Sequence, residues 1–271
     1  MIRINQFFRL QILTVALVGL VLAANSWALD SGQDQKKKKN NKKNKSPSVS
    51  QVLKKVDRQI LSYSPEKARE LLDEVEDKND PDIEAAMGRI LILEKDYDQA
   101  ANKLLGASKR SDDPYVLVDL GDAYAYAKNQ GNAQSSYQQA MQEAQAALAE
   151  SPDDSNARFT LGVAQQRLKQ YDQAAQNLDR ARIADPRNER IAFELGLTQM
   201  LLGDNLGGFD QLTKAVDINS GYAYAYYYRA LAADKIDRKD VTVNDLDRFL
   251  RLAPEAPEAD KARRILQAAR G

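Results

Sequence analysis

The sequence contains no cysteine and no histidine among its 271 residues. Without cysteine there is no disulfide, no thiolate metal ligand and no thiol nucleophile. Without histidine the chain lacks the commonest general acid or base and the commonest metal ligand. No phosphate-binding loop is present either, because Gly207-Gly208 is not followed by Lys and Ser or Thr. These absences predict a protein that is not an enzyme and that uses no cofactor.

The acidic clusters fit structural roles. Asp112-Asp113 and Asp153-Asp154 stand where helices are expected to begin, so we expect them to cap those helices. The acidic run before Pro81 lacks the alternating acidic residues, the glycine and the closing glutamate of a calcium loop. No metal site is therefore expected.

Charge is distributed unevenly along the chain. The whole sequence has 39 basic and 39 acidic residues and a net charge of zero. Residues 1–45 carry nine basic and two acidic residues (+7), which leaves 30 basic and 37 acidic residues (−7) for 46–271. A basic head thus precedes an acidic body. The composition, 43% hydrophobic and 29% charged, is that of a globular protein with a sizeable core.

The N-terminus has the pattern of a secretory signal. Arg3 and Arg9 precede the apolar run 12–24, and the small-x-small sequence Ser26-Trp27-Ala28 follows it. This pattern predicts a signal peptide over residues 1–28, cleaved near Ala28, and export to the periplasm or out of the cell. The alternative is a membrane anchor that is not cleaved. A basic cluster just after an apolar run opposes export and favours that alternative.

Residues 29–48 are expected to form a disordered, lysine-rich linker, since 36–45 contain no apolar residue. Seven lysines in this segment would be attracted to an anionic membrane surface or to a cell-wall polymer. No aromatic residue interleaves with them to stack on bases, so no nucleic-acid partner is expected. The lysines are Lys36, Lys37, Lys38, Lys39, Lys42, Lys43 and Lys45.

Small residues recur at matched steps along the rest of the chain. Three columns of them share the steps 33, 41, 34 and 34. A period near 34 is the mark of stacked helix-turn-helix units. The columns are Gly88, Gly121, Gly162, Gly196, Ala230; Ala100, Ala133, Ala174, Gly208, Thr242; and Ala107, Ala140, Ala181, Ala215, Phe249.

On these residues the chain resembles the tetratricopeptide repeat (TPR) family, whose pattern includes Leu-Gly, Tyr, Ala and a closing Pro. Leu120-Gly121 with Tyr124 and Ala133 matches it best, and the resemblance covers about residues 49–256. It implies an all-α, right-handed superhelical solenoid of about six TPR-like repeats, a fold that serves protein–protein interaction. We expect repeats over about 49–80, 81–113, 114–154, 155–188, 189–222 and 223–256, and a capping helix over 257–271.

The step of 41 residues places seven extra residues within 141–151. Met141, Ala144, Ala147 and Leu148 continue the apolar stripe, so the helix is expected to run on for about two turns, or about 10 Å. The protruding turns are either a tolerated extension or a partner contact.

The resemblance also implies where a partner lies, because the first helix of each TPR lines a concave groove. Such a groove can hold a peptide or a helix. Some TPR proteins bind the terminal carboxylate of a chaperone tail with Lys and Asn at two groove positions. This chain has other residues there, such as Ala85 with Arg89 and Val118 with Asp122, so that clamp is absent. The expected groove residues are Phe159, Val163, Phe193, Leu197, Met200, Tyr224, Tyr227, Tyr228 and Leu231.

Two alternatives stay open for the groove. The tyrosines near residue 225 either meet a partner or fill the core of the last repeat. The expected function is a scaffold or adaptor in the cell envelope, and the alternative is a glycan or cell-wall polymer binding module that uses these tyrosines and the lysine-rich segment. The sequence also leaves open whether the chain pairs with itself.

Overall fold

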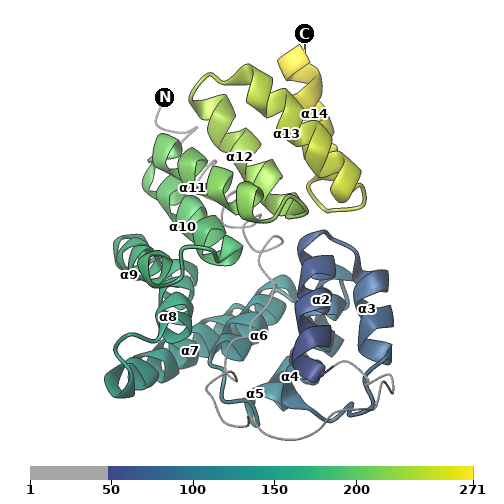
Figure 1. Ribbon diagram of the computed structural model, residues 1–271, viewed down its shortest axis with the longest axis vertical. Coiled ribbons are helices and arrows are strands. Elements are labelled where there is room, and N and C mark those ends of the chain that lie inside the picture. The colour runs from purple at the N-terminus through teal and green to yellow at the C-terminus, as the bar shows by residue number, and fades with distance from the viewer. Residues whose placement is uncertain (1–47, 271) are drawn as a thin grey trace, which may run out of the picture.

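The computed structural model describes residues 48–270, and all regular elements in this range are α-helices (Figure 1). Thirteen helices form six antiparallel pairs followed by a single last helix. They are α2 (Val49–Leu61), α3 (Pro65–Asp73), α4 (Pro81–Leu93), α5 (Tyr97–Ser108), α6 (Tyr115–Tyr126), α7 (Gln130–Glu150), α8 (Ser155–Arg167), α9 (Tyr171–Ala184), α10 (Glu189–Leu202), α11 (Asn205–Ile218), α12 (Ala223–Lys235), α13 (Lys239–Leu252) and α14 (Ala259–Arg270).

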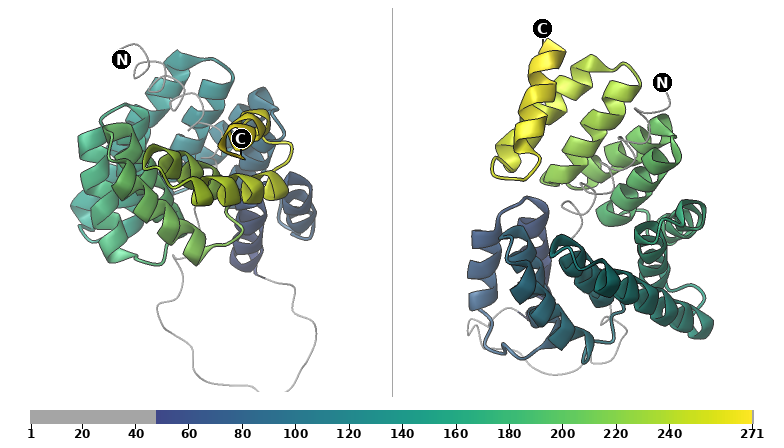
Figure 2. Two further views of the ribbon diagram at one scale, coloured as in Figure 1. Left: turned by 90° about the horizontal axis from the view of Figure 1, so that it is seen from above. Right: turned by 180° about the vertical axis from the view of Figure 1, so that it is seen from behind.

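The helices stack as a solenoid. Each helix packs on the next one in the chain, and the first helix of each pair also touches the first helix of the following pair. The stack curves round on itself (Figures 1 and 2), with the even-numbered helices α2 to α12 as its inner layer. The predicted all-α superhelical solenoid is confirmed.

The two N-terminal predictions fall outside this range. The signal peptide over 1–28 and residues 29–47 of the linker, including all seven lysines from Lys36 to Lys45, lie outside the described residues. Over 48–270, no helix combines the length and the apolar character needed to cross a membrane.

The glycine column marks the closest approach of two helices within each pair. A Cβ added at Gly88 would lie 2.5 Å from Leu104 Cγ, and one at Gly162 would lie 2.7 Å from Leu178 Cγ. The same relation, with the contact sixteen residues later in the chain, recurs at Gly121 and Gly196. Four repeats thus use a missing side chain to bring their helices together.

Each pair turns through a residue with a left-handed backbone. The amide of the next residue then donates to a carbonyl five residues back, for example Asp96 N to Leu91 O at 2.9 Å, which closes a Schellman motif. Only one of these positions is a glycine. They are Tyr63, Lys95, Lys128, Lys169, Gly203 and Asp237.

Short side chains cap the helices, as expected. Asp154 Oδ1 accepts from Asn156 N and Ala157 N at 2.9 and 3.0 Å. Asp113 Oδ1 accepts from Tyr115 N at 3.0 Å. These carboxylates satisfy amides that have no partner within the helix.

The long step in the repeat is a longer helix. α7 has 21 residues, whereas the other second helices have 9 to 14. Ala144 in the extra turns is fully buried, and Leu148 is half-buried. At the far end, α14 buries Ala262 and Leu266 against the stack and leaves Arg263 exposed, which fits the predicted cap.

The curvature brings the two ends of the stack into contact. The ring of Tyr63, in the α2–α3 turn, meets the ring of Tyr224 edge-on at 6.0 Å. Leu93, Tyr126 and Pro257 line one narrow cleft at this junction. In both front and back views the α13–α14 loop lies beside the α2–α3 turn (Figures 1 and 2). Behind these turns, buried apolar side chains of α2–α4 and α10–α14 form one hydrophobic core cluster.

Candidate interaction surface

The nine predicted groove residues all lie on inner helices, and all are buried. Phe159 and Val163 are on α8, Phe193, Leu197 and Met200 on α10, and Tyr224, Tyr227, Tyr228 and Leu231 on α12. None is more than 6% exposed. Their contact with a partner stays a prediction, because in this conformation none presents an open surface.

The tyrosines of α12 pack chiefly on other aromatic rings. Tyr227 lies 5.0 Å from Phe249 and 5.2 Å from Tyr228, between ring centroids. Phe193 of α10 meets Tyr228 at 5.8 Å. Tyr224 Oη donates a 2.5 Å hydrogen bond to Glu258 Oε2. Of the two readings left open by the sequence, these contacts favour the core of the last repeats.

Charged side chains, by contrast, gather on the inner helices of the first five repeats and in the loop before α6. We call this set the inner charge cluster. Four of its members, Arg89, Asp119, Asp122 and Glu194, are at most 2% exposed. The cluster consists of Asp57, Arg89, Asp113, Asp119, Asp122, Arg167, Arg190 and Glu194.

One half of the inner charge cluster is well paired. Arg167 Nε and Nη2 donate to the two carboxylate oxygens of Asp122 at 3.0 and 3.3 Å. Tyr137 Oη donates to the same carboxylate at 2.6 Å. Arg167 Nη1 also lies 3.7 Å from Glu194 Oε2. This bidentate arrangement is the stronger form of an arginine–carboxylate pair.

The other half is loosely paired. Arg89 lies 3.7 Å from Asp57 Oδ1 and 3.9 Å from Asp119 Oδ2, both beyond hydrogen-bond distance. Asp57 Oδ1, Arg89 Nε and Asp119 Oδ1 are buried atoms without a hydrogen-bond partner. Glu194 Oε2 is in the same condition. Buried polar atoms in a folded protein usually have a partner, so these atoms are candidates for contact with a ligand.

Arg190 lies above an aromatic platform. Its guanidinium carbon is 4.5 Å from the ring centroid of Tyr115 and 4.9 Å from that of Phe159. These two rings stack at 5.3 Å with an interplanar angle of 8°. Arg190 Nη2 has no hydrogen-bond partner. The platform therefore holds a cation by its ring faces.

Burial dominates the acid–base properties of the cluster. It raises the pKa of Asp119 to about 8, that of Glu194 to about 7 and that of Asp57 to about 6. Neighbouring guanidiniums oppose the rise: Arg89 and Arg190 lower the pKa of both aspartates. The three carboxyls are thus poised to lose or gain a proton near neutral pH.

The comparisons with known proteins agree with this architecture. Residues 132–196 match the family model of the tetratricopeptide repeat. This segment matches the tetratricopeptide repeat, and the described residues have the fold of a TPR solenoid. Proteins with these repeats are generally scaffolds without catalytic activity. None of the curated proteins compared with the chain matches it significantly.

One solved structure of a TPR protein resembles the chain in fold, and two other structures match it more weakly. TTC0263, a TPR protein of Thermus thermophilus, superimposes with a TM-score of 0.52 at 18% identity, over 70% of this chain and 98% of its own. MamA gives a TM-score of 0.40 at 19% identity, over 62% and 95% of the two chains. The first TPR domain of Spaghetti (RPAP3), bound to an HSP90 peptide, gives 0.41 at 24%, over 43% and 94%.

Sequence reasoning identified only two members of the inner charge cluster, Arg89 and Asp122, as groove positions of this TPR solenoid. A signal for a third was present, because Asp57 stands 32 residues before Arg89, and Asp122 stands 33 after it. These three residues alternate in charge at one position of successive repeats. Asp119 and Glu194 share another repeat position, two residues before Gly121 and Gly196, whereas Arg167 and Arg190 recur at neither position.

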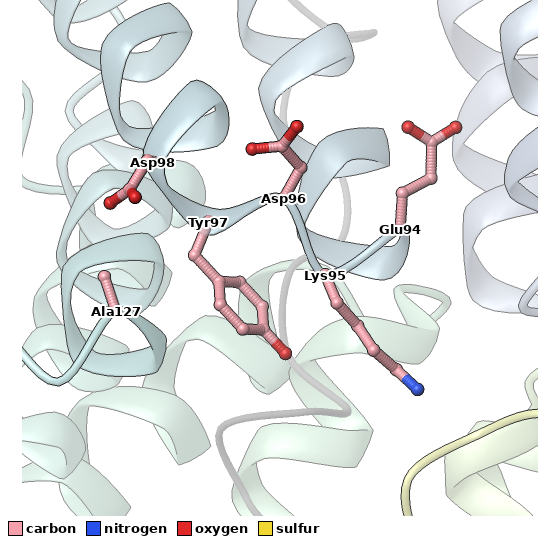
Figure 3. Close-up of a pocket in the computed structure, with 6 residues that line it drawn as sticks. All are labelled: Glu94, Lys95, Asp96, Tyr97, Asp98 and Ala127. Atoms are coloured by element: carbon pink, nitrogen blue, oxygen red, sulfur yellow. The ribbon is translucent and has the colours of Figure 1, made fainter.

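An open hollow of about 400 Å³ lies elsewhere, on the outside of the α4–α5 turn. Lys95 and Tyr97 extend to one side of the turn, and the carboxylates of Glu94 and Asp96 to the other (Figure 3). The ionic groups diverge, so they do not converge on one ligand. The described residues include no group of three or more acidic side chains placed to hold a metal ion.

Proposed function

We propose that this TPR protein is an interaction scaffold in the cell envelope and that its inner face binds a segment of a partner protein. The fold supports a protein–protein interaction role in general terms. The observation that carries the finer proposal is the inner charge cluster, where buried charged atoms lack hydrogen-bond partners although they lie on the inner helices. A bound segment would supply those partners.

The experiment is site-specific photo-crosslinking in cells. A photoreactive phenylalanine analogue replaces Tyr115 or Phe193 on the inner helices, and Ile183 serves as the control because it is 66% exposed on α9. We expect crosslinked partner at the two inner positions and none at Ile183. Crosslinks at Ile183 alone would place the partner on the outside and contradict the proposal.

Export is part of the proposal and rests on the sequence of residues 1–28. Mass spectrometry of the protein from cells tests it directly. A mature N-terminus at Leu29 supports cleavage and release, whereas Met1 supports the anchored alternative. Lipid vesicles and cell-wall polymer, each tested at low and high salt, would measure the contribution of Lys36 to Lys45, since such an attraction is screened by salt.

The glycan alternative loses its support from the tyrosines. Stacking on a sugar ring requires an exposed aromatic face. Tyr224, Tyr227 and Tyr228 are at most 1% exposed, and their faces are taken up by each other and by Phe249. We therefore carry the protein partner forward.

A further inference from the structure

We propose that the inner charge cluster receives cationic side chains of the bound segment, so that the partner of this scaffold is a basic peptide. This inference rests on the proposed function and names the chemistry of the partner. Three observations carry it: the balance of charge in the cluster, the atoms left without partners and the aromatic platform.

The cluster holds more negative than positive groups. Its five carboxyls are those of Asp57, Asp113, Asp119, Asp122 and Glu194, and its three guanidiniums are those of Arg89, Arg167 and Arg190. With every group ionised, the sum of five negative and three positive charges is −2. Burial raises the pKa of Asp119 to about 8 and that of Glu194 to about 7, so the full −2 develops only when an arriving cation draws protons off these carboxyls. Asp82 and Glu189 add negative charge beside Asp113 and Asp57. A buried charge without a counter-charge is costly, so this balance favours the arrival of a cation.

The buried atoms without a hydrogen-bond partner also favour a cation, because acceptors outnumber donors among them. Arg167 is engaged by Asp122 and Glu194, which leaves Arg89 and Arg190 to face the other three carboxyls. Four acceptor oxygens have no hydrogen-bond partner, against two donor nitrogens in the cluster. A guanidinium or an ammonium carries several donors and no acceptor, so it complements this set. The four oxygens are Asp57 Oδ1, Asp113 Oδ2, Asp119 Oδ1 and Glu194 Oε2.

The electrostatic influence of Arg190 reaches all of these carboxyls, and Arg89 lies within 4 Å of two of them, Asp57 and Asp119. The charge of Arg190 acts on Asp57, Asp113, Asp119 and Glu194 alike, although they come from α2, the loop before α6, α6 and α10. The rings beneath Arg190 show that the same wall accommodates a guanidinium on its face. An arginine-bearing segment thus finds the carboxylates within one region, beside a guanidinium that the ring faces already hold.

The partner reaches the buried cluster through the junction of the two ends. That junction includes Tyr63, Tyr224 and the cleft at Pro257, and buried apolar side chains of α2–α4 and α10–α14 belong to one hydrophobic core. An aromatic pair of this kind contributes only about 0.5–1.5 kcal/mol beyond its buried area. Separation of the ends would also expose part of the hydrophobic core shared by α2–α4 and α10–α14, so the peptide must replace those contacts as well as the ring contact.

The test measures binding of synthetic peptides to the full chain by calorimetry. The probes are four peptides of equal length built from alternating Ser and Arg, Ser and Lys, Ser and Glu, or Ser and Gln. We expect the Arg and Lys peptides to bind and the Gln peptide to bind at least tenfold more weakly. The Asp119→Asn and Glu194→Gln variants should each weaken the Arg peptide about tenfold or more, because each leaves a buried cation short of a counter-charge.

Asp210→Asn is the matched control, since Asp210 is an exposed carboxylate on α11. It should bind the Arg peptide as the unaltered protein does. Circular dichroism and a thermal melt establish that each variant is folded. Asp119→Asn and Glu194→Gln are both near-isosteric and lie on different helices, so the test still stands if one of them does not fold. The binding enthalpy at pH 7 should also differ between two buffers with different enthalpies of ionisation. Such a difference would show that the cluster releases protons when it binds the cation.

Equal binding of the Arg peptide to Asp119→Asn, Glu194→Gln and Asp210→Asn would overturn this inference and leave the scaffold proposal standing, provided that the inner positions still crosslink a partner. If the Glu peptide bound more tightly than the Arg peptide, and an Arg190→Gln variant lost that binding, the inference of a basic partner would be overturned in favour of an acidic one. Absence of inner crosslinks would remove the proposed function itself.

Discussion

The close approach at Gly121 makes a sharp prediction about stability. An alanine there would place its Cβ 2.6 Å from Tyr137 Cδ1 and 3.0 Å from Cζ. The ring cannot swing away freely, because its hydroxyl donates to Asp122 at 2.6 Å. Overpacking of this kind costs about 1–3 kcal/mol, and loss of the charged hydrogen bond adds about 1.5–3 kcal/mol. Alanine has a higher helix propensity than glycine, which offsets at most about 1 kcal/mol of this loss in stability.

We therefore expect Gly121→Ala to lower the free energy of unfolding by about 1.5–6 kcal/mol. Gly131→Ala is the control from the partner helix α7, where an added Cβ has no atom within 4 Å. That change should leave stability unchanged or raise it by up to about 1 kcal/mol. The assay is urea unfolding followed by circular dichroism at 222 nm, the usual helix signal. If Gly121→Ala proved as stable as Gly131→Ala, the tight packing inferred at the glycine column would be refuted.

Three further changes test other parts of the fold. Gly203 has a φ of 93° and open space around it, so Gly203→Ala should lower the free energy of unfolding by about 1 kcal/mol, measured in thermal melts. Lys169→Gly, at the matching turn of another repeat, should raise it by up to about 1 kcal/mol. Asp154→Ala leaves two amides of α8 without their cap, so it should lower the free energy of unfolding by about 0.5–2 kcal/mol. Urea titration measures this change. Burial raises the pKa of Glu258 from 4.5 to about 7, so the folded state holds that proton more tightly and stability falls as pH rises from 4.5 through 7. Glu258→Gln should flatten that part of the pH profile; an unchanged slope would exclude Glu258 as its source.

Local patterns in the sequence were enough to predict the fold. The glycines at 88, 121, 162 and 196 recur because each repeat needs the same close approach, and repetition makes a weak signal visible. The long α7 was predictable for the same reason, since the apolar stripe continued through Ala144 and Leu148. Asp154 shows that caps are local as well, because donor and acceptor lie within three residues.

The candidate site was much less accessible to sequence reasoning. The groove prediction placed Tyr227 and Tyr228 on the inner layer, but their burial depends on Phe193 and Phe249, which belong to other helices. Glu194 and Arg167 pair across 27 residues of sequence, and their positions within the repeat differ. Such contacts depend on the curvature of the whole stack, which no single repeat encodes.

The meeting of Tyr63 and Tyr224 has a consequence for how this array can change in evolution. An open solenoid can gain or lose whole repeats at little cost, because each repeat contacts only its neighbours. Here residues 161 positions apart in the sequence are in contact, and six pairs with a cap are the number that brings the ends together. Duplication or deletion of one repeat would separate the ends, so the closed stack fixes its own length.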